Sequence, residues 1–415
     1  MNLDFDVIVI GAGAAGLVAA AEAAERGRRT LLLEKNRRAG VKILMSGGTR
    51  CNLTHATDKW GIIRAYGEQG QFLHSALAAL SPADLVKLIE DEGVPTKVEE
   101  TGKIFPVSNR ATDVLEALLR RLSRSGAELA LSEPVQRIES LAAGGFRTAS
   151  SSRELTAEKL IVTVGGQSYP GSGTTGDGYA WAAACGHTIV PPRPALVPLT
   201  TSEVWVRELS GVTIPDVALK LFLRASPTAD KPLDNRRGSL LFTHFGLSGP
   251  VVLDISRGVT ALADPAAADV VCDFQPDLPP PQCDELLRQA TAADGKRPLA
   301  AFLAERLPRR LADALVVLAG LKAELRGAEF SKAARGQLVR AVKSTAIPIT
   351  GTRGFAKAEV TAGGVALDEI DSRSMQSKLV KGLYFAGEIL DLDGPIGGYN
   401  FQAAFSTGVL AGRSA

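Results

Sequence analysis

The chain has 415 residues, which is too many for one simple core and predicts two or three domains. Hydrophobic residues make up 45% of it and charged residues 22%, as in ordinary globular proteins, and the net charge of +2 excludes a global attraction to nucleic acid or anionic membranes. The four cysteines form no C-x-x-C pair, so neither a disulfide framework nor a zinc site is expected, and no metal is predicted.

Cysteine usage and hydropathy indicate the compartment. Few, scattered cysteines favour a reducing cytoplasm. The first strand is expected at about Phe5, which leaves no room for a secretory signal, and no run of about 18 uncharged apolar residues predicts a membrane span. We therefore expect a cytoplasmic protein with no membrane partner, and the sequence leaves its oligomeric state open.

The opening stretch has the order of parts that a dinucleotide-binding unit needs. A β-branched run at residues 7–10 predicts a buried parallel strand, and GAGAAG follows at 11–16 in G-x-G-x-x-G spacing. An alanine-rich helix should run to about Arg26, and a second buried strand at 30–33 should end at Glu34. A lone glycine motif is weak evidence, but this whole order predicts dinucleotide binding.

The residues of this first turn have separate physical roles. Gly11 permits the tight turn, Gly13 lets a pyrophosphate approach the backbone, and Gly16 lets helix and strand pack closely. The helix that begins at Ala14 and Ala15 offers free N–H groups and a positive dipole end. The turn is therefore predicted to bind the phosphates.

An acidic residue follows the second strand. Glu34 lies 18 residues past Gly16, close to the spacing expected of a carboxylate that binds a ribose hydroxyl, and Lys35 beside it is a further candidate contact. A carboxylate also disfavours a 2′-phosphate at this position, by charge repulsion.

Residues 40–55, GVKILMSGGTRCNLTH, come shortly after that strand. Two glycines and no helical period would allow a surface loop, but the position beside Glu34 favours a ligand wall. Cys51 is open to two interpretations, a small packing residue or a reactive thiolate. A thiolate needs a positive neighbour, which Arg50 could supply.

The middle of the chain contains a glycine pair and a second glycine motif. A buried strand at 160–164 ends in Gly165 and Gly166, and ligands of doubly wound sheets bind outside such strand ends. GSGTTG at 171–176 repeats the G-x-G-x-x-G spacing, but no strand leads directly into it. We interpret it as a loop that caps a helix at 177–185 and not as a second nucleotide site.

Composition shifts divide the remainder. Four prolines in PPRPALVP (191–198) predict a linker, and the sequence beyond favours strands, then helices, then strands again. The predicted first part of the cofactor domain is 1–190 and its second part is 351–415. Between them we expect a β-rich domain at 191–278 and about 344–350, with a helical insertion at 279–343.

Two features of this inserted part bear on function. His244 in FTHFGLSGP is either a packed histidine or a substrate-site acid or base. Residues 296–343 contain 11 Lys+Arg and 4 Asp+Glu, a local charge of +7, which is typical of a solvated helical face or of an anionic partner such as RNA. Aromatic residues are scarce there, which argues against base stacking, so nucleic acid is kept as an alternative partner and not as the expected one.

A glycine-dense loop, GEILDLDGPIGGYNFQAAFSTG (387–408), runs into the final helix. A nicotinamide domain would not need this loop, whereas FAD is longer and its flavin end lies far from its adenine end. We interpret the loop as the second anchor of FAD; the alternative is a glycine-rich turn before a terminal amphipathic helix. Its candidate contacts are Gly387, Glu388, Gly397, Gly398, Tyr399 and Asn400.

Four segments carry a family resemblance: GAGAAGLVAA, GVKILMSGGTRCNLTH, FTHFGLSGP (242–250) and GLYFAGEILDLDGPIGGYNFQAAFSTG (382–408). They are spread over nearly the whole chain. With them the chain resembles the two-dinucleotide-binding-domain flavoproteins. Within these it resembles the BaiN-like group, also called the aminoacetone-oxidase family of NAD(P)/FAD-dependent oxidoreductases. The fold so implied is α/β: a Rossmann-like FAD-binding domain of glutathione-reductase type, interrupted by a β-barrel-like domain with a helical insertion.

The resemblance also implies cofactor contacts. Residues 40–52 would wrap the FAD pyrophosphate and flavin, and Val135 would pair its backbone with adenine. Thr49 departs from the family pattern, since relatives often carry glycine there. The implied contacts in the wrapping segment are Gly40, Lys42, Ile43, Ser46, Gly47, Gly48, Arg50, Cys51 and Asn52.

The leading functional hypothesis is an FAD-dependent oxidoreductase with hydride transfer through flavin N5 and a small-molecule substrate. The resemblance suggests reduction of an enone-type C=C bond, with NAD(P)H as transient donor, or oxidation of a small amine. The alternatives are a flavin-dependent RNA-modifying or RNA-binding factor and a flavin-binding sensor without turnover. The candidate catalytic residues are His244, Cys51 and Asn52.

Overall fold

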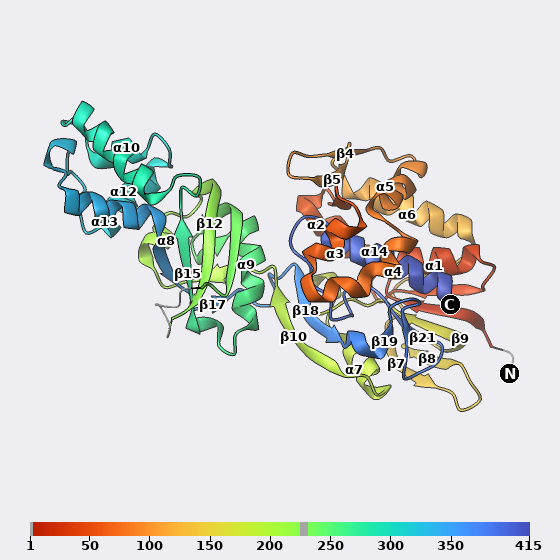
Figure 1. Cartoon of the computed structure of the whole chain (residues 1–415). Helices are drawn as coiled ribbons and strands as arrows, with labels where there is room; N and C mark the ends of the chain where they lie inside the picture. Colours follow the sequence, from red (N-terminus) through yellow and green to blue (C-terminus); the bar gives the residue numbers. More distant parts are fainter. Residues whose placement is uncertain (1–2, 225–230) are drawn as a thin grey trace. The chain divides into compact units, whose positions relative to one another are not determined.

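The computed structural model describes residues 3–224 and 231–415. The chain forms two compact units, one of Met1–Pro194 with Glu359–Ala415 and one of Ala195–Ala358. Both chain termini lie in the first unit, so the second is inserted into it along the sequence (Figure 1).

The unit boundaries differ from the predicted ones because of strand pairing. PPRPALVP was predicted as a linker, but residues 191–195 belong to strand β10 (Ile189–Ala195), which pairs with β18 (Val360–Val365). A two-stranded edge tolerates proline because few of its N–H groups are needed for pairing. The first unit was also predicted to resume at 351, but β17 (Gly351–Thr352) pairs with β11 (Leu199–Thr200) and stays in the second unit.

A mixed sheet forms the centre of the first unit. Its main path runs β19-β20-β21-β9-β1-β2-β6, and β7 and β8 form a hairpin that extends from β9. β1 pairs in parallel with β2 and β9, while β21 continues in parallel beyond β9 and β6 beyond β2. The strands are β1 (Phe5–Ile10), β2 (Thr30–Leu33), β6 (Glu128–Ala130), β7 (Val135–Ser140), β8 (Phe146–Ser150), β9 (Glu154–Val162), β19 (Ile370–Asp371), β20 (Gln376–Ser377) and β21 (Leu383–Phe385).

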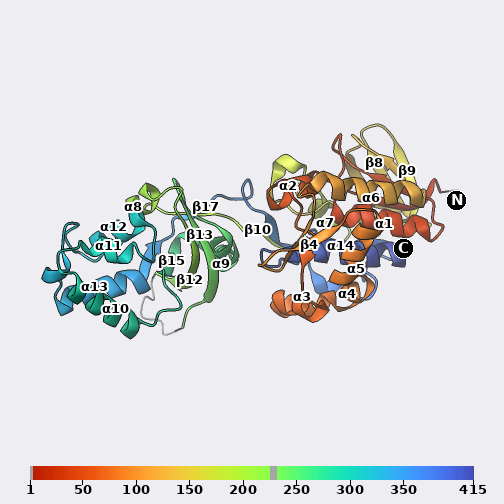
Figure 2. The same cartoon turned by 90° about the horizontal axis from the view of Figure 1, so that it is seen from above.

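Helices cover this sheet, and α1 lies between α6 and α14 (Figure 2). A small sheet of β3 (Thr54–His55), β4 (Thr96–Val98) and β5 (Lys103–Pro106) adds to the unit. The helices are α1 (Ala14–Glu25), α2 (Val41–Thr49), α3 (Lys59–Ala65), η1 (Gly67–Leu73), α4 (His74–Ala79), α5 (Pro82–Asp91), α6 (Ala111–Ser125), η2 (Pro170–Ser172), α7 (Asp177–Ala184), η5 (Leu367–Glu369) and α14 (Tyr399–Ser414).

The second unit is built on an antiparallel sheet in the order β16-β15-β12-β13-β14-β11-β17. Helix α9 packs on β12 and β13, and α10 to α13 come between β15 and β16 and share one apolar core with the sheet. The remaining strands are β12 (Thr213–Leu223), β13 (Asp234–Thr243), β14 (Gly246–Ser248), β15 (Ala268–Asp273) and β16 (Thr345–Pro348). The helices are α8 (Val204–Glu208), α9 (Pro250–Ala261), η3 (Pro265–Ala267), α10 (Pro280–Ala293), α11 (Leu299–Leu303), α12 (Arg309–Leu318), η4 (Gly327–Glu329) and α13 (Lys332–Lys343).

One stretch of the described residues, Gly67–Asp91, is long and apolar enough to cross a membrane by length and composition. The structure divides it into η1, α4 and α5. Leu80 has an extended backbone, and Ser81 caps α5 through a reciprocal bond pattern with Asp84. The stretch is therefore a set of short helices.

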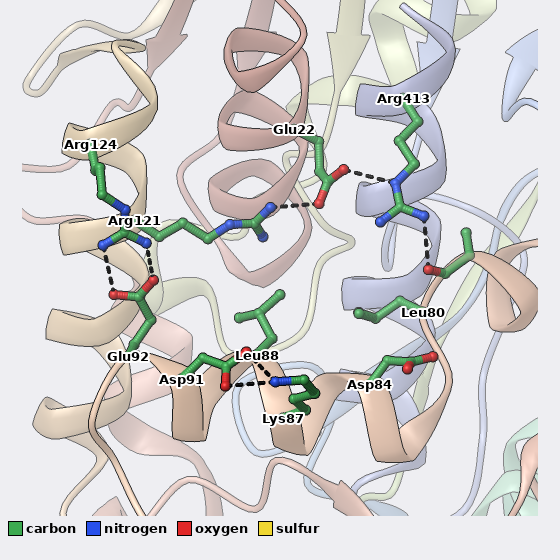
Figure 3. Close-up of a pocket in the computed structure, with 11 residues that line it drawn as sticks. Glu22, Leu80, Asp84, Lys87, Leu88, Asp91, Glu92, Arg121, Arg124 and Arg413 are labelled. Carbon is green, nitrogen blue, oxygen red and sulfur yellow. Dashed lines mark hydrogen bonds and ion pairs between the residues drawn. The ribbon is translucent and has the colours of Figure 1, made fainter.

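A cavity of about 460 Å³ opens between α1, α5, α6 and α14, and ion pairs line it (Figure 3). Glu22 on α1 accepts hydrogen bonds from Arg121 on α6 (2.5 Å) and Arg413 on α14 (2.8 Å). Arg124 pairs with Glu92 beside them. Glu22 lies roughly 13 Å along the α1 axis from Gly13, so this network joins helices and is separate from the dinucleotide turn.

Candidate dinucleotide site

The predicted contact residues gather at one edge of the parallel sheet. β1 leads into Gly11, β2 into Glu34, β9 into Gly165 and Gly166, and β21 into Gly387. Because these four strands are parallel, their carboxyl ends meet at the same edge, and the strand order reverses at β1. Ligands of doubly wound sheets bind at such a point.

The first turn is packed tightly on one side and open on the other. Gly11 has a φ of 101°, and a Cβ there would lie 2.8 Å from the Thr163 carbonyl oxygen. A Cβ on Gly16 would lie 1.8 Å from the Gly11 carbonyl oxygen. At Gly13 no described heavy atom lies within 4 Å of the Cβ position, and no side chain caps α1 there. The open side can therefore receive a phosphate against the start of α1, at Ala14 and Ala15.

Glu34 is fixed in orientation by the backbone. Its side chain is buried, and its two oxygens accept hydrogen bonds from the N–H groups of Ala12 and Asn36, both at 2.8 Å. Its carbonyl oxygen accepts from the Glu133 N–H (2.9 Å), two residues before Val135 begins β7. The Glu34 carboxylate still has lone pairs that can accept hydrogen bonds from ribose hydroxyls. Val135, the predicted adenine contact, comes two residues after Glu133, which is bonded to Glu34.

Residues 40–52 begin as a helix, which their lack of helical period did not predict. The Gly40 N–H donates to the Ala12 carbonyl (2.8 Å) and so joins α2 to the first turn. Ile43 is buried, and the helix breaks at Ser46, where ψ is 150°. Gly47 and Gly48 then take left-handed backbones with φ of 56° and 67°. The non-helical backbone is thus confined to the second half of the segment, and the role of the segment as a ligand wall stays a prediction.

The three cations among the predicted cofactor contacts are all paired with carboxylates. Lys35 pairs with Asp177 (2.6 Å) and Lys42 with Glu388 (2.5 Å). Arg50 pairs with Glu99 at 2.6 Å and lies 4.0 Å above the Phe105 ring. The three cations are 31%, 30% and 38% exposed, so a phosphate could compete for each of them.

The closing loop reaches the first turn. Gly387 has a φ of 78°, and a Cβ on it would lie 3.0 Å from the Cβ of Ala15 at the start of α1. The Gly387 N–H donates to the Thr407 hydroxyl (3.0 Å). Gly387 and the start of α1, about 370 residues apart in the sequence, therefore lie side by side.

The end of this loop packs against β3 and is shaped by its own polar side chains. A Cβ on Gly398 would lie 2.6 Å from the Thr54 carbonyl oxygen, and the Gly397 carbonyl lies 3.2 Å from the His55 Nδ1. Tyr399 stacks on His55 with ring centroids 4.9 Å apart. Asn400 donates to the Gly394 carbonyl (3.0 Å) and accepts from its N–H (2.8 Å). Asn400 thus shapes the loop through its side chain.

Cys51 and Asn52 follow the glycine pair of the 40–52 segment and are buried. Burial raises the pKa of the Cys51 thiol to about 12, so the structure favours the packing interpretation over a reactive thiolate. Asn52 is 8% exposed, and its Oδ1 and the Thr54 hydroxyl are buried without a hydrogen-bond partner in the described chain. Buried polar atoms of this kind normally have partners, which makes them candidates for ligand contact.

His244 belongs to the second unit, in the turn between β13 and β14, and is exposed. Its ring meets Phe245 edge-on at 5.1 Å, and the Arg353 guanidinium lies 4.5 Å over the Phe245 ring.

Sequence reasoning missed three polar residues of the site. Ser168 donates to Glu388 (2.5 Å), Thr361 donates its backbone N–H to Glu388 (3.0 Å), and Tyr179 is buried nearby. No short motif marks them. Ser168 and Thr361 do lie within two residues of the glycine pairs 165–166 and 363–364, a signal that could have been used.

The polar groups and glycine turns at this sheet edge fit FAD. An open glycine turn at a helix start, an oriented buried carboxylate and a second glycine loop against the same helix suit the two ends of an extended dinucleotide. Among the described residues, no group of three His, Cys, Asp or Glu could hold a metal ion.

Known proteins resemble the chain over almost its full length. The model of the HI0933-like protein Rossmann domain matches residues 5–414. The ribosomal RNA dihydrouridine synthase of Escherichia coli K12 is 34% identical over 407 residues, 97% of this chain and 96% of that protein. The 3-dehydro-bile acid delta(4,6)-reductase of Clostridium scindens is 33% identical over 413 residues, 98% of each. The apo Sdh1 complex of Mycobacterium smegmatis shares the fold, with a TM-score of 0.50 and 15% identity over 99% of this chain and 67% of that one.

Proposed function

Since the chain belongs to the HI0933-like family and is an FAD-dependent oxidoreductase, we propose that it uses NAD(P)H to reduce a C=C bond conjugated to a carbonyl group. FAD, when bound, supplies the hydride chemistry at flavin N5. The observation that most supports the proposal is the approach of Gly387 to Ala15, because these residues belong to the two predicted cofactor anchors.

The names of the relatives support one reaction class. One names reduction of delta(4,6) bonds in a 3-dehydro compound, and the other names a dihydro form of uridine. In each case the affected C=C bond is conjugated to a carbonyl. Adding a hydride to the carbon β to the carbonyl and a proton to the α carbon saturates such a bond, so the chain needs a proton donor as well as a hydride source.

Different residues are proposed to bind the cofactor and to donate the proton. The start of α1 binds pyrophosphate, Glu34 binds a ribose hydroxyl, and the 387–400 loop holds the other half of the cofactor. His244 is the proposed proton donor, because its imidazole is exposed and a histidine side chain can act as a general acid.

Anaerobic stopped-flow mixing tests the proposal. The purified yellow protein should bleach with NADPH or NADH, and a cyclic enone should restore the colour. Bleaching by small amines, with no response to either nicotinamide, would instead indicate amine oxidation. A flavin that stays oxidised with every donor would indicate a sensor without turnover. His244→Gln should lower the rate of enone reduction while leaving bleaching by NAD(P)H unchanged.

A second candidate substrate is uracil within RNA. Residues 296–343 carry a net charge of +7, and a relative at 34% identity bears the name of a ribosomal RNA enzyme. Several of these cations are already paired, among them Arg297 with Glu305 and Arg335 with Asp284. Phe302 is buried, so stacking on it is not available. Salt-sensitive RNA binding, with saturation of a uridine by NADPH, would favour this candidate over a free enone.

A further inference from the structure

We propose that Tyr179 is a positioning residue for Glu388, and that its hydroxyl replaces Lys42 as a partner of this carboxylate when an anionic cofactor draws Lys42 away. The inference rests on the FAD site assigned above. It concerns residues of α7, α2 and the loop after β21, all within the first unit.

Tyr179 carries a buried hydroxyl that nothing in the described chain satisfies. The residue is 7% exposed, and its hydroxyl oxygen has no hydrogen-bond partner among the described residues. Buried hydroxyl groups are nearly always bonded, because burial removes the water that would otherwise bond them. A conformation with a partner for this group should therefore exist.

The hydroxyl lies beside the groups that hold Glu388. A Cβ on Gly166 would lie 3.0 Å from the Tyr179 hydroxyl oxygen and 2.4 Å from the Thr361 Oγ1. The Thr361 N–H donates to Glu388 Oε1. The next residue of the loop also touches α7, since a Cβ on Gly178 would lie 2.6 Å from Ile389 Cδ1. The proposed bond requires the Glu388 side chain to rotate toward the phenol.

Electrostatics make Tyr179 a donor. Burial, and then the nearby carboxylates of Glu388 and Asp391, raise the pKa of the Tyr179 phenol. The phenol therefore keeps its proton at neutral pH. A carboxylate only accepts hydrogen bonds, so the bond formed must run from the Tyr179 hydroxyl to Glu388.

Lys42 is the partner that can leave. Glu388 is held by Lys42 (2.5 Å), Ser168 (2.5 Å) and the Thr361 N–H (3.0 Å). Lys42 is 30% exposed on a flexible stem, whereas Glu388 is 18% exposed. A phosphate would compete for the ammonium group and leave a largely buried carboxylate short of a donor. The Tyr179 hydroxyl would then supply the missing hydrogen-bond donor.

The test uses Tyr179→Phe in the full chain, with FAD affinity followed by flavin fluorescence and thermal melting followed without cofactor. Without FAD, the variant should melt at the same temperature or higher, because an unsatisfied buried hydroxyl is removed. Its FAD dissociation constant should rise about tenfold, the usual effect of losing a hydrogen bond to a charged group. In a Glu388→Gln background the same change should alter FAD affinity by less than about twofold.

Tyr384→Phe is the matched control, since its hydroxyl donates to the Ser414 carbonyl (2.9 Å). It should lower the melting temperature and leave FAD affinity unchanged. If Tyr179→Phe lowers the cofactor-free melting temperature and leaves FAD affinity unchanged, the inference is overturned. If the wild-type chain binds no FAD, the assignment of the FAD site is overturned together with the inference. FAD binding without enone reduction would overturn only the proposed reaction.

Discussion

Thr49 carries a backbone φ of 70°, a left-handed conformation that a β-branched residue adopts at a cost of about 1–2 kcal/mol. The side chain is exposed. Thr49→Gly should therefore raise the free energy of unfolding by about 0.5–1 kcal/mol, after the greater freedom of glycine in the unfolded chain is subtracted. Urea unfolding followed by circular dichroism measures the change.

Thr101→Gly provides the comparison, because Thr101 is also exposed and lies outside the left-handed region. It should lower the free energy of unfolding by about 0.5–1 kcal/mol. Equal effects of the two substitutions would show that strain at residue 49 is not released by glycine.

Glu34 offers a binding prediction. Glu34→Ala should weaken FAD binding by about 1–3 kcal/mol, because the ribose loses a hydrogen bond to a charged acceptor and the Ala12 and Asn36 N–H groups lose theirs. Titration of the cofactor-free protein with FAD gives the affinity. Glu92→Ala removes the partner of Arg124 instead, and should alter stability with no change in affinity. Unchanged affinity in Glu34→Ala would place the ribose contact elsewhere.

Asp391 offers a pH prediction. Burial, together with repulsion from Asp393, raises the pKa of the Asp391 carboxyl above its ordinary value of 3.8. The folded state then binds the proton more tightly than the unfolded state, so this group lowers stability as pH rises through that range. Asp391→Asn should melt above wild type at pH 7, and the difference should shrink toward pH 4. A difference that does not vary with pH would contradict the assignment.

Residues with a local signal were predictable, and residues that meet through folding were not. Glycine spacing and a strand end were enough to place Gly11–Gly16 and Glu34 at one sheet edge. Thr361 bonds Glu388, and Tyr179 is buried near them, only because α7 and β18 fold against the loop after β21. Cys51 could not be decided from its neighbours in sequence, since its burial depends on distant side chains.

At the scale of elements, glycines set the spacing of α14 against α1. A Cβ on Gly408 would lie 2.4 Å from the Ala15 carbonyl oxygen, and one on Gly412 would lie 2.3 Å from that of Ala19. Gly408→Ala should therefore force the helices apart and cost about 1–3 kcal/mol of stability. It should also weaken FAD binding, because Ala15 begins the phosphate turn.

Gly336→Ala is the matched control in another helix, α13, where the nearest atom to the new Cβ is Arg340 Nη1 at 4.0 Å. It should stabilise the chain by about 0.5–1 kcal/mol through helix propensity. Urea unfolding compares both variants with wild type. If both substitutions raise the free energy of unfolding, α14 can move away from α1 without loss of stability.

Element prediction failed where tertiary contacts overrode local preference. The prolines of 191–194 suggested a linker, but the pairing of β10 with β18 keeps them in a strand. The 40–52 segment lacks a helical period, yet packing of Ile43 into the core supports a short helix there. Both errors arise from partners that local sequence does not reveal.

At the scale of the whole molecule, each unit has its own apolar core. The alternation of strand-rich and helix-rich composition indicated an inserted domain. Its limits depended on which short strands pair, as with β17 and β11, and two-residue strands leave almost no pattern in a sequence.

This division predicts that the first unit alone holds FAD. The Thr188 carbonyl accepts from the Ala366 N–H (3.0 Å), and a Cβ on Gly363 would lie 2.5 Å from the Pro191 carbonyl oxygen. β10 and β18 therefore run antiparallel, and residues 194 and 359 can be joined by a hairpin loop of about four residues in place of 195–358.

The shortened chain should fold and bind FAD within about tenfold of the wild-type affinity, a difference of about 1.4 kcal/mol. It should not reduce an enone, because the proposed proton donor His244 is removed with residues 195–358. Circular dichroism and FAD titration separate the outcomes, and Glu34→Ala in the same background should weaken binding as it does in the full chain. A folded product without FAD affinity would mean that the second unit supplies an essential cofactor contact. A product that fails to fold would mean that the core of the first unit is not sufficient by itself.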